Sequence, residues 1–154
     1  KQGELYDSNR HTLFAMLKKV GVKGIDLGVV GDDYKAIKKV IKKGDKKADM
    51  VITSAGASVG EADYIYDILN ELGKVNIWKI AIKPGRPLVF GALKNSTFFG
   101  LPGNPVSSFV TFQLLVRPWL LKTMGATDYL HRCVNAVANF NKNNFLLLRI
   151  FSRF

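Results

Sequence analysis

The sequence predicts an α/β fold: three layers with a mostly parallel sheet in the middle, followed by part of a small β domain. Short apolar runs typical of buried strands alternate with longer segments of helical periodicity, which is the pattern of a sheet covered by helices. Loops rich in glycine, proline, serine and asparagine separate these segments. The 154 residues are 47% hydrophobic and 23% charged, close to the averages of globular proteins, which excludes wholesale disorder.

Helix, strand, helix and strand are expected to follow one another in the first third of the chain. Each helix begins beside an Asp, Ser or Asn that can cap its free amides, and each ends near a glycine. Each strand is a short apolar run. The first helix is expected between a cap at Asp7, Ser8 or Asn9 and a stop at Gly21, and the second between a cap at Asp33 and Gly44. The strands are expected at residues 25–30 and 50–53.

The alternation continues through the middle of the chain up to a last long helix. A loop of small residues leads into a helix and a strand, and the strand is followed by residues 83–87, whose two prolines no regular element can contain. A hairpin and a second proline-containing turn come next. The expected helices are 62–72 and 106–124, and the expected strands are 75–82, 88–90 and 97–100.

The character of the sequence changes near Gly125, which predicts a domain boundary. Residues 1–125 are expected to form the α/β domain. Residues 126–154 contain a candidate strand at 134–140, a polar turn and an apolar end, which together resemble the first hairpin of a β domain. We expect this second domain to be incomplete, because the chain stops before such a domain closes.

The chain is strongly basic, with 23 Lys and Arg against 12 Asp and Glu and a net charge of +11. A polyanionic partner is one interpretation, but many lysines recur at helical spacing, so we favour a solvated helix face and expect no nucleic-acid partner. The single cysteine, Cys133, cannot form an internal disulfide, and no apolar run is long enough to span a membrane. The first residues do not resemble a secretory leader, although an excised fragment would also lack one. We therefore expect a cytoplasmic location and no membrane partner.

A loop of small residues at 54–60 is the first candidate binding site. It follows an expected strand and precedes a helix, so its backbone amides and the helix N-terminus can approach an anion closely. Its spacing matches neither a P-loop nor a dinucleotide fingerprint, and a simple tight turn is an equally good interpretation. The candidate binding residues are Ser54, Gly56, Ser58 and Gly60.

Two carboxylates are candidate ligands for a magnesium ion. Asp63 lies in the first turn of the helix after the small-residue loop, and Asp32 lies at another strand end. Mg²⁺ is commonly held by one or two carboxylates together with phosphate oxygens of a substrate. The alternatives are that Asp63 only complements the helix dipole and that Asp32 is only a turn residue.

A rigid basic loop is the second candidate site. Lys83 and Arg86 lie among Pro84, Gly85 and Pro87, and Lys79 precedes them. Prolines restrict the loop, so its cations are expected to be held in place, as suits the binding of phosphate or another oxyanion. Solvated loop charge is the alternative.

The turn at 101–107 is the third candidate site. Asn104 is expected to cap the last helix with Pro105 at its first position, which explains much of this sequence structurally. Gly103 and Ser107 could also contribute a free amide and a hydroxyl to an anion site. A zinc site is not expected, because the two histidines and one cysteine lack the spacing of ligands.

Four sequence blocks occur together between Tyr6 and Gly125: YDSN, ITSAGASVGEADY, AIKPGRP and FGLPGNPVS. Their order and spacing closely resemble the MogA-like domain of the molybdopterin molybdotransferases, the MoeA and gephyrin E-domain family. The resemblance implies an enzyme that inserts molybdate into adenylylated molybdopterin and releases AMP, assisted by a divalent metal, usually Mg²⁺. It also implies an elongated homodimer and a MogA-type partner enzyme. A chain of this length would then keep the fold and weak pterin binding but lack turnover, because the partner subunit's share of the cleft is missing.

The same resemblance implies roles for individual residues. Ser58 and Asp63 would belong to the phosphate and metal region, while Lys83 and Arg86 would contact phosphate or molybdate. Arg86 takes a place that lysine more often fills in the family. Lys79 matches a basic position, and Ser107 follows a turn that helps to line the site. We therefore expect Asp63, Lys83 and Arg86 to be catalytic.

Three other functions remain open from the sequence. A MogA-type adenylyltransferase or pterin-binding domain shares the same blocks, although the β segment after Ala126 favours the transferase. A scaffold without enzymatic activity, as in gephyrin, uses the same fold. A basic nucleic-acid module is least favoured, because no basic ribbon interleaved with aromatic residues is present.

Overall fold

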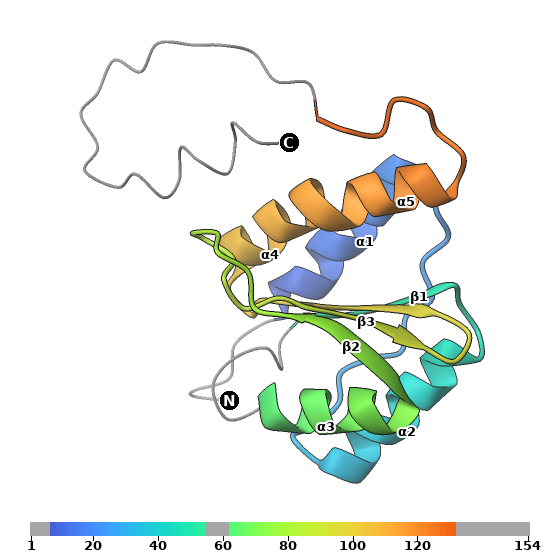
Figure 1. The fold of residues 1–154 in the computed structure, drawn as a ribbon, viewed down its shortest axis with the longest axis vertical. Helices are drawn as coiled ribbons and strands as arrows, with labels where there is room; N and C mark the ends of the chain where they lie inside the picture. Colours follow the sequence, from blue (N-terminus) through green and yellow to red (C-terminus); the bar gives the residue numbers. More distant parts are fainter. Residues whose placement is uncertain (1–6, 55–61, 132–154) are drawn as a thin grey trace.

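A computed structural model of the chain describes residues 7–54 and 62–131 as three layers. A four-stranded sheet forms the middle layer, and helices cover both of its faces (Figure 1). The strands are β1 (Met50–Ser54), β2 (Gly73–Trp78), β3 (Val89–Leu93) and β4 (Thr97–Leu101). The helices are α1 (Ser8–Val20), α2 (Tyr34–Asp45), α3 (Ala62–Leu72), α4 (Pro105–Thr111), the π-helical turn η1 (Phe112–Val116) and α5 (Arg117–Thr123).

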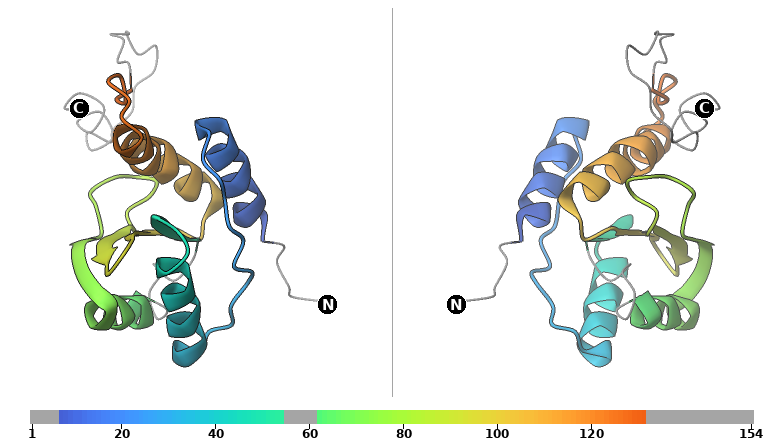
Figure 2. Two further views of the ribbon diagram at one scale, coloured as in Figure 1. Left: turned by 90° about the vertical axis from the view of Figure 1, so that its right-hand side faces the viewer. Right: turned by 90° about the vertical axis from the view of Figure 1, so that its left-hand side faces the viewer.

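The two helical layers have separate cores. Helices α1, α4 and α5 lie on one side of the sheet, and α2 and α3 lie on the other (Figures 1 and 2). Phe112 and Leu101 are fully buried on the first side, and Phe98 and Ile68 are fully buried on the second. This arrangement confirms the predicted three-layer α/β fold.

The sheet is mixed, with the order β1-β4-β3-β2. β1 pairs parallel with β4, whereas β3 runs antiparallel to both β4 and β2. Three of the four strands therefore share one direction, as a mostly parallel sheet requires. Ser54 lies opposite Leu101, and Trp78 lies opposite Val89. The carboxyl ends of β1, β4 and β2 consequently lie along one edge of the sheet.

The predicted N-terminal caps of α1 and α2 and the glycine stop of α1 are confirmed, whereas α2 runs past Gly44 to Asp45 and ends at Lys46. The Asp7 side chain accepts a hydrogen bond from the Arg10 amide at 3.1 Å, and α1 ends at Gly21, which takes a φ of 92°. Asp33 caps α2 by accepting from the amide of Ala36 at 2.6 Å. Each bond satisfies an amide that has no partner inside its helix.

The last long helix is continuous from α4 to α5 but widens in the middle. The amide of Arg117 bonds to the carbonyl of Phe112, five residues back, as in a π-helical turn. Pro118 follows this bond, and proline has no amide and crowds the carbonyl four residues before it. We attribute the wide turn to this proline. The predicted helix 106–124 is thus correct in its extent.

Two predicted strands differ from the structure. Residues 25–30 form no strand in the described part of the chain, and Val29 is 72% exposed. Instead Asp26 accepts from the amide of Gly28, which has a φ of 84°, and forms an ion pair with Arg10 that lowers the pKa of its carboxyl. The predicted strand 75–82 ends early, at Trp78, because Lys79 adopts a φ of 72°.

The predicted hairpin is confirmed, and Asp45 at the end of α2 fixes its turn. Its carboxylate accepts from the Asn95 amide at 2.9 Å, the Asn95 side chain at 3.0 Å and the Ser96 hydroxyl at 2.8 Å. Burial acts to raise the pKa of the Asp45 carboxyl, but these hydrogen bonds together hold it below the ordinary value.

Replacing Asp45 with alanine should therefore destabilise the fold in a pH-dependent way. We expect a loss of about 1 to 2 kcal/mol near neutral pH, because the three donors lose a charged acceptor that is partly exposed to solvent. A lowered pKa stabilises the fold above the carboxyl's unfolded value of about 4, and this contribution disappears as the pH falls through the folded value. Urea unfolding at several pH values measures the difference, with exposed Asp49→Ala as control. A loss that is independent of pH would contradict this role.

The predicted C-terminal β domain lies mostly outside the described residues. Residues 126–131 contain no helix or strand, and the candidate strand at 134–140 falls beyond residue 131. The boundary at Gly125 therefore remains a prediction, although α5 does end just before it. In the part of the chain that the structure describes, no helix is both long enough and apolar enough to cross a membrane.

Candidate functional site

One edge of the sheet gathers most of the segments that the sequence singled out. The carboxyl ends of β1, β2 and β4 lie there, and β2 and β4 lead into the loop 79–88 and the turn 102–104. The amino-terminal ends of α3 and α4 lie at this same edge, on the left-hand side of Figure 1. We call this edge the carboxyl rim. In open α/β sheets, ligands commonly bind at such an edge.

A hydrogen bond joins the first and last sequence blocks at the carboxyl rim. The Asn9 side-chain amide donates to the Gly103 carbonyl at 2.8 Å, although the two residues are 94 positions apart. Asn9 is only 8% exposed. The sequence indicated Asn9 merely as a possible cap, but Asp7 caps α1 and Asn9 positions the turn before α4 instead. Its place in the YDSN block was the one signal of this role.

The turn before α4 is held by its own cap. Asn104 accepts from the Ser107 amide at 3.1 Å and from the Ser107 hydroxyl at 3.3 Å, and Pro105 is the first residue of α4. Ser107 is 8% exposed, whereas Gly103 and Asn104 are exposed. The structural interpretation of this turn is confirmed, and Gly103 and Asn104 remain accessible at the rim.

Two buried hydroxyls at the rim are missing a hydrogen-bond partner. Thr53 lies next to the last residue of β1, and Ser108 lies in the first turn of α4 and is 2% exposed. Neither hydroxyl oxygen has a partner within the described residues. Buried hydroxyls are normally satisfied. Ser108 follows the candidate residue Ser107 at the start of the last helix. Thr53 was not selected from the sequence, although its position at the end of an expected strand could have indicated a place at the site.

The basic loop is anchored at its base, and its charges are exposed. The backbone amide of Lys79 donates to the carbonyl of Leu88 at 2.8 Å, and that of Ile80 donates to the carbonyl of Arg86 at 3.0 Å. The side chains of Lys79, Lys83 and Arg86 are all exposed. The predicted rigidity of the loop is consistent with these bonds and with its two prolines, of which Pro84 is exposed and Pro87 half-buried.

Gly85 attaches the tip of this loop to α4. It is buried with a φ of 115°, a conformation that residues with a side chain rarely adopt. A Cβ atom here would lie 2.7 Å from the side chain of Thr111, too close for any residue but glycine. Thr111 is itself fully buried, and its hydroxyl donates to the carbonyls of Ser107 and Ser108. The basic loop therefore packs on the same helix turn that carries Ser107.

Several predicted site residues can be placed only in part. Gly56, Ser58 and Gly60 lie outside the described residues, while Ser54 ends β1 and is half-buried. Asp63 is in the first turn of α3, where the structure describes the backbone alone.

Asp32 is exposed in the bend before α2. No hydrogen bond or ion pair connects it to the carboxyl rim among the described residues. The structure thus brings the basic loop and the turn before α4 together, and among the described residues no hydrogen bond or ion pair tests whether Asp32 belongs with them.

No ready-made metal centre is found in residues 7–54 and 62–131, where no three His, Cys, Asp or Glu side chains come together. A metal with many protein ligands is therefore not a feature of the described residues. A Mg²⁺ ion fits this donor set only if a substrate supplies further oxygens, as phosphates commonly do.

Comparison with known proteins identifies the family. The sequence pattern of the family described as "Probable molybdopterin binding domain" matches residues 1–122. The molybdopterin molybdenumtransferase of Haemophilus influenzae is 49% identical over 129 residues, which are 84% of this chain and 32% of that protein. The enzyme of the same name from Nostoc sp. is 39% identical over 127 residues, 80% of this chain and 29% of the relative.

A solved structure shares the fold. The molybdopterin biosynthesis MoeA protein of Pyrococcus horikoshii superimposes with a TM-score of 0.74 at 39% sequence identity, over 81% of this chain and 31% of that one. The chain thus spans about a third of the length of the proteins it matches. Because the family pattern covers well over half of the residues, the chain belongs to the molybdopterin-binding domain family.

Proposed function

We propose that this chain forms the substrate-binding domain of a molybdopterin molybdenumtransferase. The whole enzyme would take adenylylated molybdopterin and molybdate, insert molybdate into the pterin dithiolene, and release AMP. The observation that carries the proposal is the carboxyl rim, where the turn before α4 and the basic loop pack against the same helix turn. Relatives named molybdopterin molybdenumtransferase support the same reaction class.

The charges at the rim suit this chemistry. Release of AMP places negative charge on the departing phosphate, and molybdate is itself a dianion. Lys79, Lys83 and Arg86 are exposed cations on an anchored loop, so they can meet these charges without first being ordered. Arginine in particular can bind an oxyanion through two parallel hydrogen bonds.

A magnesium ion would be held by few protein ligands. Asp63 is the carboxylate that we favour, since the first turn of α3 lies at the carboxyl rim (Figure 1), and Asp32 is a second candidate. When bound, Mg²⁺ would neutralise phosphate charge. We further propose that the protein acts in the cytoplasm as a homodimer and exchanges substrate with a MogA-type enzyme.

Calorimetry with AMP and sodium molybdate tests the proposed function. We expect AMP to bind the chain more tightly when both molybdate and Mg²⁺ are present than with either one omitted. Binding of AMP that ignores molybdate would favour the MogA-type adenylyltransferase instead. Binding of a short single-stranded DNA with steep salt dependence, and no response to AMP, would contradict both assignments.

Replacing Asp63 with asparagine should abolish the effect of Mg²⁺ on AMP binding. The amide keeps the size of the side chain but removes the negative charge that a hard cation requires. Asp67→Asn, one turn further along α3 and exposed, is the matched control and should leave the Mg²⁺ effect unchanged. Circular dichroism checks that both variants keep their helices. An Asp63→Asn variant with an unchanged Mg²⁺ response would refute the ligand assignment.

A further inference from the structure

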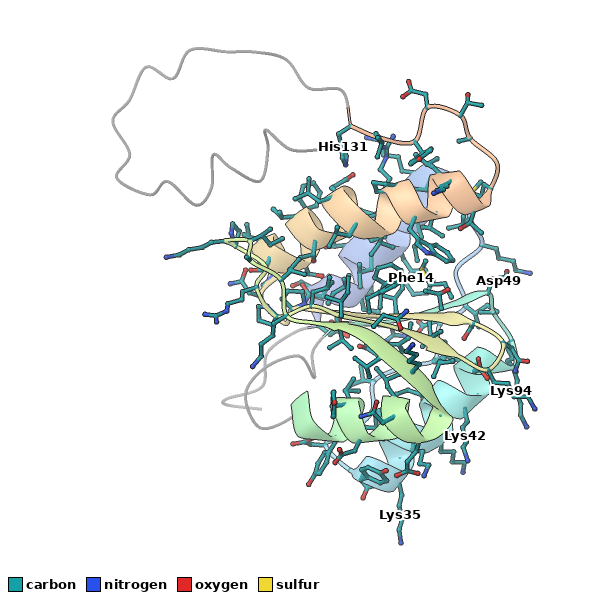
Figure 3. All side chains as sticks on the ribbon, in the orientation of Figure 1. Phe14, Lys35, Lys42, Asp49, Lys94 and His131 are labelled. Carbon is teal, nitrogen blue, oxygen red and sulfur yellow. The ribbon has the colours of Figure 1, made fainter. Side chains whose placement is uncertain are left out.

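A hollow in the surface lies at the opposite edge of the sheet from the carboxyl rim. It measures about 380 Å³ and lies between the ends of α2 and α3 and the hairpin that joins β3 to β4. Its lining includes three lysines, Lys42, Lys46 and Lys94, and two leucines, Leu72 and Leu93. Figure 3 shows Lys42 and Lys94 at this end of the molecule. We call it the lysine hollow.

The two carboxylates in the lining bond to other groups, although the charge of Lys42 also acts on Glu71. Glu71 forms an ion pair with Lys38, outside the lining, and accepts the hydroxyl hydrogen of Tyr34. The Lys38 bond above all lowers the pKa of Glu71, and the Glu71 bond raises the pKa of Tyr34 to about 12. Asp45 is occupied by its three hydrogen bonds to the hairpin turn.

The three lysines consequently keep an excess of positive charge. Among the described residues, none of them forms an ion pair within 4.0 Å, where the pairs found are Arg10–Asp26 and Lys38–Glu71. The lining itself holds three lysines against two carboxylates, a net charge of +1, and adding Lys38, which pairs with Glu71 from outside the lining, makes the local charge +2. The carboxyl-terminal ends of α2 and α3 offset roughly one of these charges.

Further lysines on α2 and just after it add positive charge around the lysine hollow. Residues 35–47 carry seven lysines and a single carboxylate, Asp45. The seven are Lys35, Lys38, Lys39, Lys42, Lys43, Lys46 and Lys47. A solvated helix face accounts for lysines on the outside of α2, but it does not account for Lys94, which reaches the same hollow from the hairpin. Convergence of cations from two separate elements distinguishes the lysine hollow from an ordinary basic surface.

We propose that the lysine hollow binds a small phosphorylated molecule that carries at least two negative charges. Its volume is at the lower end of the range for small-ligand sites, about 300 to 1,000 Å³. Ammonium groups are common phosphate ligands, and Leu72 and Leu93 in the lining suit an apolar or ring portion of the ligand. Since the hollow and the carboxyl rim lie at opposite ends of the strands, the two sites are separate.

Titration of the isotope-labelled chain with sodium pyrophosphate tests the proposal. At about 0.15 M salt, which screens long-range attraction, we expect saturable NMR shifts in the amides of residues 44–46 and 94–95. The triple substitution Lys42→Gln, Lys46→Gln and Lys94→Gln should weaken binding about tenfold or more. The matched control Lys18→Gln, Lys19→Gln and Lys122→Gln removes the same charge from α1 and α5 and should change the affinity less than about twofold.

Three results would overturn the proposal. Shifts confined to residues 79–86 would show that pyrophosphate binds the basic loop alone. Equal weakening by the two triple variants would reduce the effect to overall charge. Binding of single-stranded DNA to α2 without any saturable response to pyrophosphate would identify a nucleic-acid surface instead.

Discussion

Replacing Phe112 with alanine is expected to lower the free energy of unfolding by about 3 to 5 kcal/mol. Phe112 is fully buried in the core between the sheet and helices α1, α4 and α5, where it packs in one cluster with Leu101 and Val116. Truncation removes a large apolar surface from this core and leaves a cavity that its neighbours can fill only in part. Denaturant unfolding followed by circular dichroism measures the loss.

Phe109 supplies the matched control for this variant. It lies three residues earlier in the same continuous helix, in α4, and is 46% exposed. Phe109→Ala should therefore cost less than about 1 kcal/mol. A similar loss of unfolding free energy in both variants would mean that the burial of Phe112 does not stabilise the packing of this helix on the sheet. Because α4 also carries Ser107 and contacts Gly85, a weakened Phe112 core should loosen the carboxyl rim as well.

Local signals in the sequence predicted the elements that depend on local interactions. Asn104 caps the helix that it was expected to cap, Asp7 proves to be the cap among the three candidates before α1, and Gly21 ends α1. Caps and glycine stops act within one helical turn, so their effect is visible in a short stretch of sequence. The hairpin around Asn95 was predictable for the same reason, although its anchor Asp45 is 50 residues away.

Residues 25–30 show where local signals fail. An apolar run forms a strand only if another strand offers it hydrogen bonds, and the sequence cannot show whether such a partner is available. In the described residues, Asp26 bonds to Gly28 and Arg10 instead, and the run remains irregular. The contact between Asn9 and Gly103 was unpredictable for a related reason, since it joins the first turn of α1 to the turn before α4, 94 residues away.

The candidate site was predicted as a set of loops but not as a geometry. Parallel strand direction was enough to infer that the basic loop and the turn before α4 share an edge. The packing of Gly85 on Thr111 was not foreseen, because it depends on the path of each loop after its strand. Asp32 was also expected to follow a strand, at residues 25–30, but the structure has no strand there. Strand direction therefore gives no information on the position of Asp32.

The double substitution Lys83→Gln and Arg86→Gln should weaken the binding of AMP and molybdate more than any other change at the rim. A hydrogen bond to a charged group contributes about 1.5 to 3 kcal/mol, so losing two should lower the affinity by about a hundredfold or more. Calorimetry under the conditions used for the unmodified chain measures the loss. Lys18→Gln with Lys19→Gln, in the last turn of α1, is the charge-matched control.

Replacing Gly85 with valine separates the position of these cations from their charge. Valine keeps Lys83 and Arg86 but cannot easily adopt a φ of 115°, and its Cβ would collide with Thr111. If binding depends on the way the loop is packed against α4, Gly85→Val should lose most of the affinity that the double substitution loses. Unchanged affinity in the valine variant would mean that charge alone is sufficient, and the argument that packing on α4 positions the site would then be wrong.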